Sequence, residues 1–158
     1  MTRTERGFTL IELVVTVAIV GILASIAVPM AEVAAQRVKE RDLRTALRQV
    51  REALDAYKRA VDDGRVERRA DGSGYPRNLD LLSAGVADAK SPGGGQIYFL
   101  RRLPRDPFSP RADVSAADTW GKRAYASPPD APAEGEDVFD VYSLSGRTGL
   151  NGVAYREW

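Results

Sequence analysis

The stretch "RGFTLIELVVTVAIVGILASIAVP", residues 6–29, decides the fold of this chain of 158 residues. From Phe8 to Ala31 the only charged residue is Glu12. At about 1.5 Å per residue, a helix over residues 8–28 is roughly 30 Å long, the thickness of a bilayer's hydrocarbon core. Its apolar residues lie on all sides, which is typical of a membrane span or a deeply buried helix. A domain this small can hardly bury such a helix, so the sequence predicts a membrane span.

A cleaved secretory signal peptide is the alternative for this segment. The stretch "ASIA", residues 24–27, could serve as its small-residue cleavage site. However, the apolar run is long for a signal, and no break precedes the helical pattern that follows. Basic residues flank the run on both sides: Arg3 and Arg6 before it, Arg37, Lys39 and Arg41 after it. The positive-inside rule therefore does not fix the orientation of the span.

Glu12 is out of place in an apolar run. A carboxylate costs about 2.5–3.5 kcal/mol at the centre of a bilayer, and less near an interface. Glu12 lies near the N-terminal end, where it can reach the headgroups and meets the positive end of the helix dipole. If the chain were cut after Gly7, Phe8 would carry an α-ammonium within about one turn of Glu12. In a stack of identical subunits, the ammonium of one could neutralise the carboxylate of the next.

Residues 6–29 resemble the class III signal and N-terminal helix of type IV pilins and type II secretion pseudopilins. The resemblance implies a leader at residues 1–7, cleavage by prepilin peptidase between Gly7 and Phe8, and N-methylation of Phe8 by the same enzyme. It implies that Glu12 guides the docking of subunits during assembly. The helix would first anchor the subunit as a single pass in the bacterial inner membrane and later form the filament core. The N-terminus would be cytoplasmic and the rest of the chain periplasmic.

Pro29 ends the apolar run. Proline lacks a backbone N–H, so we expect a break, bend or loosening of the helix between the span at residues 8–29 and the segment that follows. In the resembling family, local melting near this point accompanies assembly.

Residues 30–64 continue the helical pattern with an amphipathic face. The charged pairs Glu40–Arg44 and Arg48–Glu52 are four residues apart and are expected on the wet side. The stretch "DDG", residues 62–64, is the expected stop, which gives one helix of roughly 55 residues, about 80 Å long. The apolar stripe expected to pack the globular head consists of Leu43, Leu47, Val50, Leu54, Tyr57 and Val61.

Residues 65–158 form the rest of the head. Strand composition occurs in "IYFLRRL" (97–103), "RAYAS" (123–127) and "VFDVYSL" (138–144). We predict an antiparallel sheet of three or four strands on the helical stripe, hence an α+β, pilin-like fold. "SPGGG" (91–95) is a predicted loop, and "LPRDPFSP" (103–110) a rigid connector. The aromatic residues expected to join sheet and helix are Phe99, Tyr125, Phe139 and Tyr142.

The head also resembles the major pseudopilins of type II secretion, through "YPRNLDLL", "LPRDPF", "TWGKRAYASPPD" and "FDVYSLS" in this order. That group binds calcium near its C-terminus with aspartates. Here the tail "SGRTGLNGVAYREW", residues 145–158, has no aspartate, although calcium prefers carboxylates among its oxygen ligands. We therefore expect no cofactor and an absent or degenerate calcium site, with Tyr155 and Trp158 closing the tail by packing. The resemblance still leaves calcium as an alternative, because Asn151 and backbone carbonyls remain as oxygen ligands. The acids Glu134, Glu136 and Asp137 are interpreted as a solvated loop.

The composition speaks against catalysis and nucleic-acid binding. The chain has no Cys and no His, which excludes disulfides, thiol nucleophiles, histidine bases and most zinc sites. Ser127 and Ser143 consequently have no histidine to activate them. The net charge of +1 gives no electrostatic footprint for nucleic acid.

The sequence therefore predicts a structural pseudopilin that is not an enzyme. It would polymerise with other pseudopilin subunits on an inner-membrane assembly platform, and its partners would include prepilin peptidase and membrane lipid. One alternative is a minor type IV pilin of a pilus or DNA-uptake filament. Another is a signal-anchored periplasmic binding domain that does not polymerise.

Overall fold

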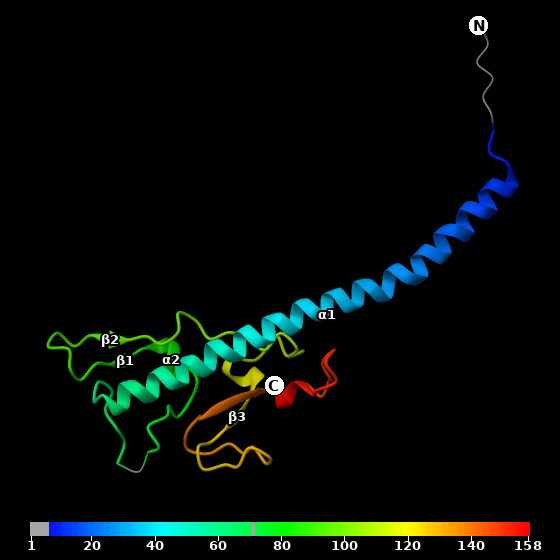
Figure 1. The fold of residues 1–158 in the computed structure, drawn as a ribbon. Helices are drawn as coiled ribbons and strands as arrows, with labels where there is room; N and C mark the ends of the chain where they lie inside the picture. The colour runs from blue at the N-terminus through cyan, green and yellow to red at the C-terminus, as the bar shows by residue number, and fades with distance from the viewer. Residues whose placement is uncertain (1–6, 71) are drawn as a thin grey trace, which may run out of the picture. The chain divides into compact units, whose positions relative to one another are not determined.

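The computed structural model of the chain describes residues 7–70 and 72–158, so most of the predicted leader, residues 1–6, lies outside the described part. The described chain divides into two compact units, one ending at Val38 and one running from Lys39 to Trp158. The long helix α1, Leu10–Asp62, has residues in both units. Figure 1 shows the elements of the second unit, the head, gathered along the cyan-to-green part of α1.

Helix α1 confirms the prediction of one long N-terminal helix, and it ends at Asp62 inside the predicted stop. Gly64 follows with φ +66°, a left-handed conformation that glycine adopts without a Cβ clash. Pro29 lies inside α1, and residues on both sides of it are helical. The break expected there is therefore corrected: proline removes one backbone donor, and the flanking hydrogen bonds of the helix continue past it. A loosening of the helix at Pro29 stays a prediction.

The core of the head confirms the predicted stripe, since the whole stripe from Leu43 to Val61 is buried. Other parts of the chain close this core with Leu79, Leu82, Trp120, Val138, Val141 and Tyr155. Of the four predicted aromatic contacts, Phe99 packs on Tyr57 with ring centroids 5.3 Å apart. Tyr125 is exposed, so the core depends more on Trp120 and Tyr155 than the sequence indicated.

The strands differ from the prediction of a single sheet. Within the described residues there are two separate two-stranded antiparallel sheets, β1 (Val86–Ala87) with β2 (Gln96–Ile97), and β3 (Trp120–Arg123) with β4 (Asp140–Ser143). The segment "IYFLRRL" contributes only Ile97 to a strand. One reason is that the backbone N–H groups of Phe99 and Leu100 both donate to the carbonyl of Leu82, at 3.0 and 2.8 Å, instead of to a neighbouring strand.

Short helices and a polar cluster complete the head. The one-turn helix α2 spans Leu81–Ala84, and two 3₁₀ turns, η1 and η2, span Ala117–Thr119 and Tyr155–Glu157. The predicted connector at 103–110 is anchored by Asp106, which is buried and accepts a hydrogen bond from Ser143 Oγ at 2.6 Å. The Trp120 indole N–H donates to the Pro104 carbonyl at 2.9 Å, so the connector is held to β3 as well as to β4.

Candidate functional site

The start of α1 is built as a capping box. The Thr9 backbone N–H and hydroxyl both donate to Glu12 Oε2 at 2.9 Å, while the Glu12 N–H donates to Thr9 Oγ1 at 3.3 Å. This reciprocal arrangement satisfies donors that the first turn of a helix leaves open. The other carboxylate oxygen of Glu12, Oε1, accepts no hydrogen bond from residues 7–70 or 72–158. Glu12 thus caps its own helix through one carboxylate oxygen.

The two residues at the predicted cleavage point have no structural task in the described chain. A Cβ on Gly7 would meet nothing within 4 Å, and the backbone of Gly7 does not require glycine. The Phe8 side chain is 82% exposed. Both residues precede α1, which begins at Leu10. The capping box lies C-terminal to the Gly7–Phe8 bond, so a cut there would leave the start of the helix intact.

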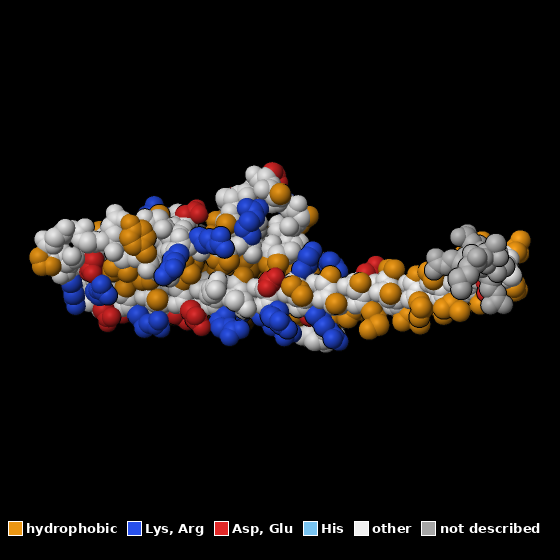
Figure 2. All heavy atoms as spheres, turned by 90° about the horizontal axis from the view of Figure 1, so that it is seen from above, with side chains coloured by type: hydrophobic (Ala, Val, Ile, Leu, Met, Phe, Trp, Pro, Cys, Tyr) orange, Lys and Arg blue, Asp and Glu red, His pale blue; other side chains and the backbone are white. Residues whose placement is uncertain are grey.

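The first part of α1 presents an apolar surface without a partner inside the described chain. Its large side chains from Phe8 to Met30 are exposed, and the helix is long and apolar enough to cross a membrane by length and composition. Figure 2 shows hydrophobic side chains covering this part of α1, whereas Lys and Arg side chains follow the part that belongs to the head. Such a surface requires lipid or other protein around it.

Glu40 is the largest departure from the predicted helix surface. Its side chain was expected on the wet side opposite Arg44, but it is only 6% exposed. Glu40 Oε1 accepts hydrogen bonds from the backbone N–H of Leu150 at 2.8 Å and from the Tyr155 hydroxyl at 2.9 Å. A carboxylate on α1 therefore holds the C-terminal segment. The guanidinium of Arg44 lies over the Trp158 ring, 4.4 Å from its centroid.

The polar side chains of the C-terminal segment, residues 145–158, contact groups of the protein itself. Within residues 7–70 and 72–158, no three His, Cys, Asp or Glu side chains gather as metal ligands. Asn151 Oδ1 accepts the N–H of Val153 at 3.1 Å, and the exposed carboxylate of Glu157 faces Arg156 at 3.7 Å. The predicted closure of the tail by packing is present, since Tyr155 stacks on Phe108 at 4.1 Å and meets Trp158 edge-on at 5.0 Å.

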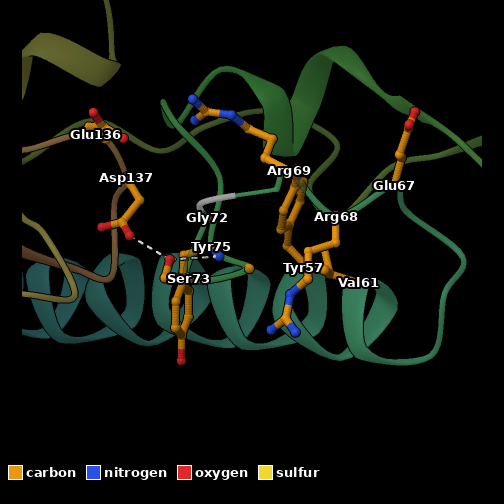
Figure 3. A pocket seen from close by; sticks show the side chains of 11 residues that line it. Tyr57, Val61, Glu67, Arg68, Arg69, Gly72, Ser73, Tyr75, Glu136 and Asp137 are labelled. Carbon is orange, nitrogen blue, oxygen red and sulfur yellow. Dashed lines mark hydrogen bonds between the residues drawn. The ribbon is translucent and has the colours of Figure 1, made fainter.

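A small cavity lies between α1 and the segment around Gly72 (Figure 3). Its volume is about 50 Å³, far below the several hundred Å³ of typical ligand sites. Figure 3 shows the Ser73 hydroxyl between Asp137 and the backbone of Tyr75, and it donates to Asp137 Oδ2. Asp137 Oδ1 also accepts the N–H of Tyr125 at 2.8 Å. Asp137 is thus a structural acceptor and not part of a solvated loop, whereas Glu134 and Glu136 are exposed as predicted.

The two serines considered as nucleophiles also make structural hydrogen bonds. Ser127 Oγ accepts the N–H of Ala133 at 2.8 Å, which closes the loop between β3 and β4. Ser143 is fully buried and donates to Asp106. Neither hydroxyl has a histidine partner, because the chain contains none.

Two features escaped the sequence reasoning, and one of them had a clear signal. The capping box follows the T-x-x-E pattern at the start of an apolar helix, residues 9–12, and could have been recognised. The role of Glu40 had no comparable signal, because its partners lie 110 and 115 residues away in the sequence. The interpretation of Glu12 is also extended, since part of its carboxylate already serves its own helix.

Known proteins are similar both to the N-terminal segment and to the whole chain. A family model described as "Prokaryotic N-terminal methylation motif" matches residues 2–28. The type II secretion system core protein G of Dickeya chrysanthemi is 27% identical over 157 residues, which cover 96% of this chain and 95% of that protein. The protein of the same name from Klebsiella pneumoniae is 30% identical over 147 residues, covering 90% and 97%. That from Vibrio cholerae is 31% identical over 149 residues, covering 90% and 81%.

No solved structure matches the chain significantly. Family membership therefore depends on sequence identity sustained over nearly the whole length, together with the methylation motif and the long helix followed by a small α+β head. On these grounds the chain belongs to the family of type II secretion system core protein G, the major pseudopilins.

Proposed function

We propose that this chain is the structural subunit of a type II secretion pseudopilus. Prepilin peptidase cleaves it between Gly7 and Phe8 and methylates the new amino group. The apolar part of α1 holds the subunit in the inner membrane, with the leader in the cytoplasm and the head in the periplasm. Subunits then polymerise with copies of themselves and with other pseudopilins on a membrane platform. The polymer, which is not itself catalytic, drives protein export.

The observation that carries this proposal is the geometry at the start of α1. Cleavage after Gly7 places an ammonium on Phe8, next to the capping box. Glu12 Oε2 accepts from Thr9, whereas Oε1 accepts no hydrogen bond from the residues that the structure describes. In a stack of subunits, the Phe8 ammonium of one copy can meet Oε1 of a neighbour, and this pairing offsets the cost of a carboxylate surrounded by apolar helices. The apolar surface of α1 then packs against equivalent surfaces.

The capping box allows the charge of Glu12 to be separated from its role in the helix. Glu12→Gln keeps an oxygen that can accept from Thr9, because glutamine also serves at this position of a capping box. It removes the negative charge. Thr9→Ala removes the hydroxyl cap and keeps the charge. We expect Glu12→Gln to abolish assembly and export, and Thr9→Ala to retain most of both.

The measurement is secretion of exoproteins by the native host, together with recovery of assembled subunits in a sheared and sedimented fraction. Membrane levels of each variant are compared by immunoblotting, so that loss of the subunit is not taken for loss of assembly. Normal export and assembly by Glu12→Gln would contradict the proposal. That result would favour a membrane-anchored domain that does not polymerise.

A further inference from the structure

The C-terminal segment folds back on itself through backbone hydrogen bonds. Thr148 and Ala154 form an antiparallel bridge, and the Gly149 N–H donates to the Val153 carbonyl at 2.9 Å. The N–H of Gly152 donates to the Gly149 carbonyl at 2.9 Å. The carbonyl oxygens of Val153 and Gly149 thus already accept hydrogen bonds inside this loop, residues 147–155.

At its point of contact with α1, the loop offers two hydrogen-bond donors to a carboxylate. The N–H of Leu150 and the hydroxyl of Tyr155 converge on one oxygen of Glu40. Two converging donors create a positive potential that favours an anion and disfavours a metal cation. Glu40 supplies that anion from within the chain, and Tyr155 is completely buried at this contact.

The charged side chains around the loop also disfavour a bound cation. Arg147 lies over the Phe108 ring, 5.7 Å from its centroid, so the loop carries a cation beside its aromatic contacts. Glu157, the only acid in residues 145–158, is exposed and faces Arg156. The cationic side chains and the donor-rich contact both disfavour a divalent ion.

We infer that the buried carboxylate of Glu40 fastens the C-terminal loop of this head in place of a bound calcium ion, so that the folded head does not depend on calcium. Glu40 acts as a positioning residue: it orients Leu150 and Tyr155. Through Tyr155 it fixes the Phe108 ring, which stacks on Tyr155, and the Trp158 ring, which meets Tyr155 edge-on. Glu40 would stabilise the head in this way whether or not the subunit assembles as proposed.

The test is thermal unfolding of the full-length chain in detergent, followed by tryptophan fluorescence, because Trp120 and Trp158 both report on the head. Each sample is measured with a calcium chelator, with millimolar calcium chloride, and with magnesium chloride as a control for ionic strength. The variants are Glu40→Gln and Tyr155→Phe. Glu52→Gln, an exposed residue of the same helix, is the matched control.

We expect the Tm of the wild-type chain to be the same in chelator and in calcium. Glu40→Gln and Tyr155→Phe should lower Tm by roughly 3–8 °C, since each weakens a buried, charge-assisted hydrogen bond, while Glu52→Gln changes it little. If Glu40→Gln yields no folded protein, the Tm of Tyr155→Phe tests the inference, because this variant removes only a hydroxyl. A Tm raised by calcium but not by magnesium would overturn the inference. The inference would also be overturned if Glu40→Gln and Tyr155→Phe had the same Tm as Glu52→Gln.

Discussion

Glu12 shows how one carboxylate can meet two demands. Through Oε2 it caps α1, and through its charge it would attract the amino end of a neighbouring subunit in the proposed assembly. A glutamine could meet only the first demand. The contrast between Glu12→Gln and Thr9→Ala therefore separates a local need of the helix from a need of the polymer.

Gly121 is a second residue whose side chain, or lack of one, is dictated by its neighbour. It pairs with Tyr142 across β3 and β4, and a Cβ at this position would overlap the Tyr142 ring. Gly121→Ala should destabilise the head by about 1–3 kcal/mol, because the ring must leave its rotamer or the strands must separate. Urea unfolding of the full-length chain in detergent measures the loss.

Gly146→Ala is the matched control for Gly121→Ala. A Cβ on Gly146 would meet nothing within 4 Å, and its backbone does not need the left-handed region. We expect this variant to unfold within about 0.5 kcal/mol of the wild type. Equal stability of the two alanine variants would show that the Tyr142 ring does not hold the β3–β4 pair.

At the scale of elements, Pro29 leaves the Ser25 carbonyl without its usual donor one turn later, because proline has no N–H. We predict that α1 loses helix near this point when subunits leave the membrane for the polymer. Far-UV circular dichroism of the subunit in vesicles and in sheared polymer measures this change. Pro29→Ala, which restores the donor, should remain equally helical in both. Equal helicity of the wild type in the two states would contradict the prediction.

The helix could be predicted from the sequence and the sheets could not, for a physical reason. The stripe from Leu43 to Val61 repeats every three or four residues, so its burial follows from local spacing. The strands have only two to four residues, and their partners come from distant segments. Hydrogen bonds to the Leu82 carbonyl decide the fate of residues 99 and 100, and no local pattern encodes that acceptor.

The candidate site also contains residues that the sequence could predict and one that it could not. Gly7, Phe8 and Glu12 are close in sequence, so their spacing could be recognised without a structure. Glu40 looked like a surface residue, because an acid four residues before Arg44 is the usual pattern of an exposed pair. Its burial depends on a loop more than a hundred residues away, which only the folded chain brings next to it.

At the scale of the whole molecule, acid should weaken the head. A hydrogen bond from Lys58 lowers the pKa of the Asp62 carboxyl, and one from Arg65 lowers that of Asp88. A hydrogen bond from Ser115 does the same for the pKa of Asp118. A carboxyl with a lowered folded-state pKa stabilises the fold above its unfolded pKa, near 3.8, and the contribution disappears as the pH falls through the folded value.

We therefore expect a Tm that is constant between pH 7 and about 5 and falls steadily below about pH 4, measured with the full-length chain in detergent. Asp88→Asn removes one of these carboxyls, so its Tm should be lower than that of the wild type at neutral pH and should approach it in acid. If the Tm of Asp88→Asn fell further below that of the wild type as the pH decreased, the pKa of Asp88 would be raised by folding and not lowered, which would contradict this prediction.

The proposed assembly requires that the chain be cut so that Phe8 gains a free amino end able to answer Glu12. Mass spectrometry of the intact protein, extracted from membranes of the native host, measures this directly. The expected mass corresponds to a chain that begins at Phe8 and carries one methyl group, and fragmentation should place that methyl on the Phe8 nitrogen. A chain that retains residues 1–7, or one cut near Ala27, would contradict the proposed processing and with it the pairing of Glu12.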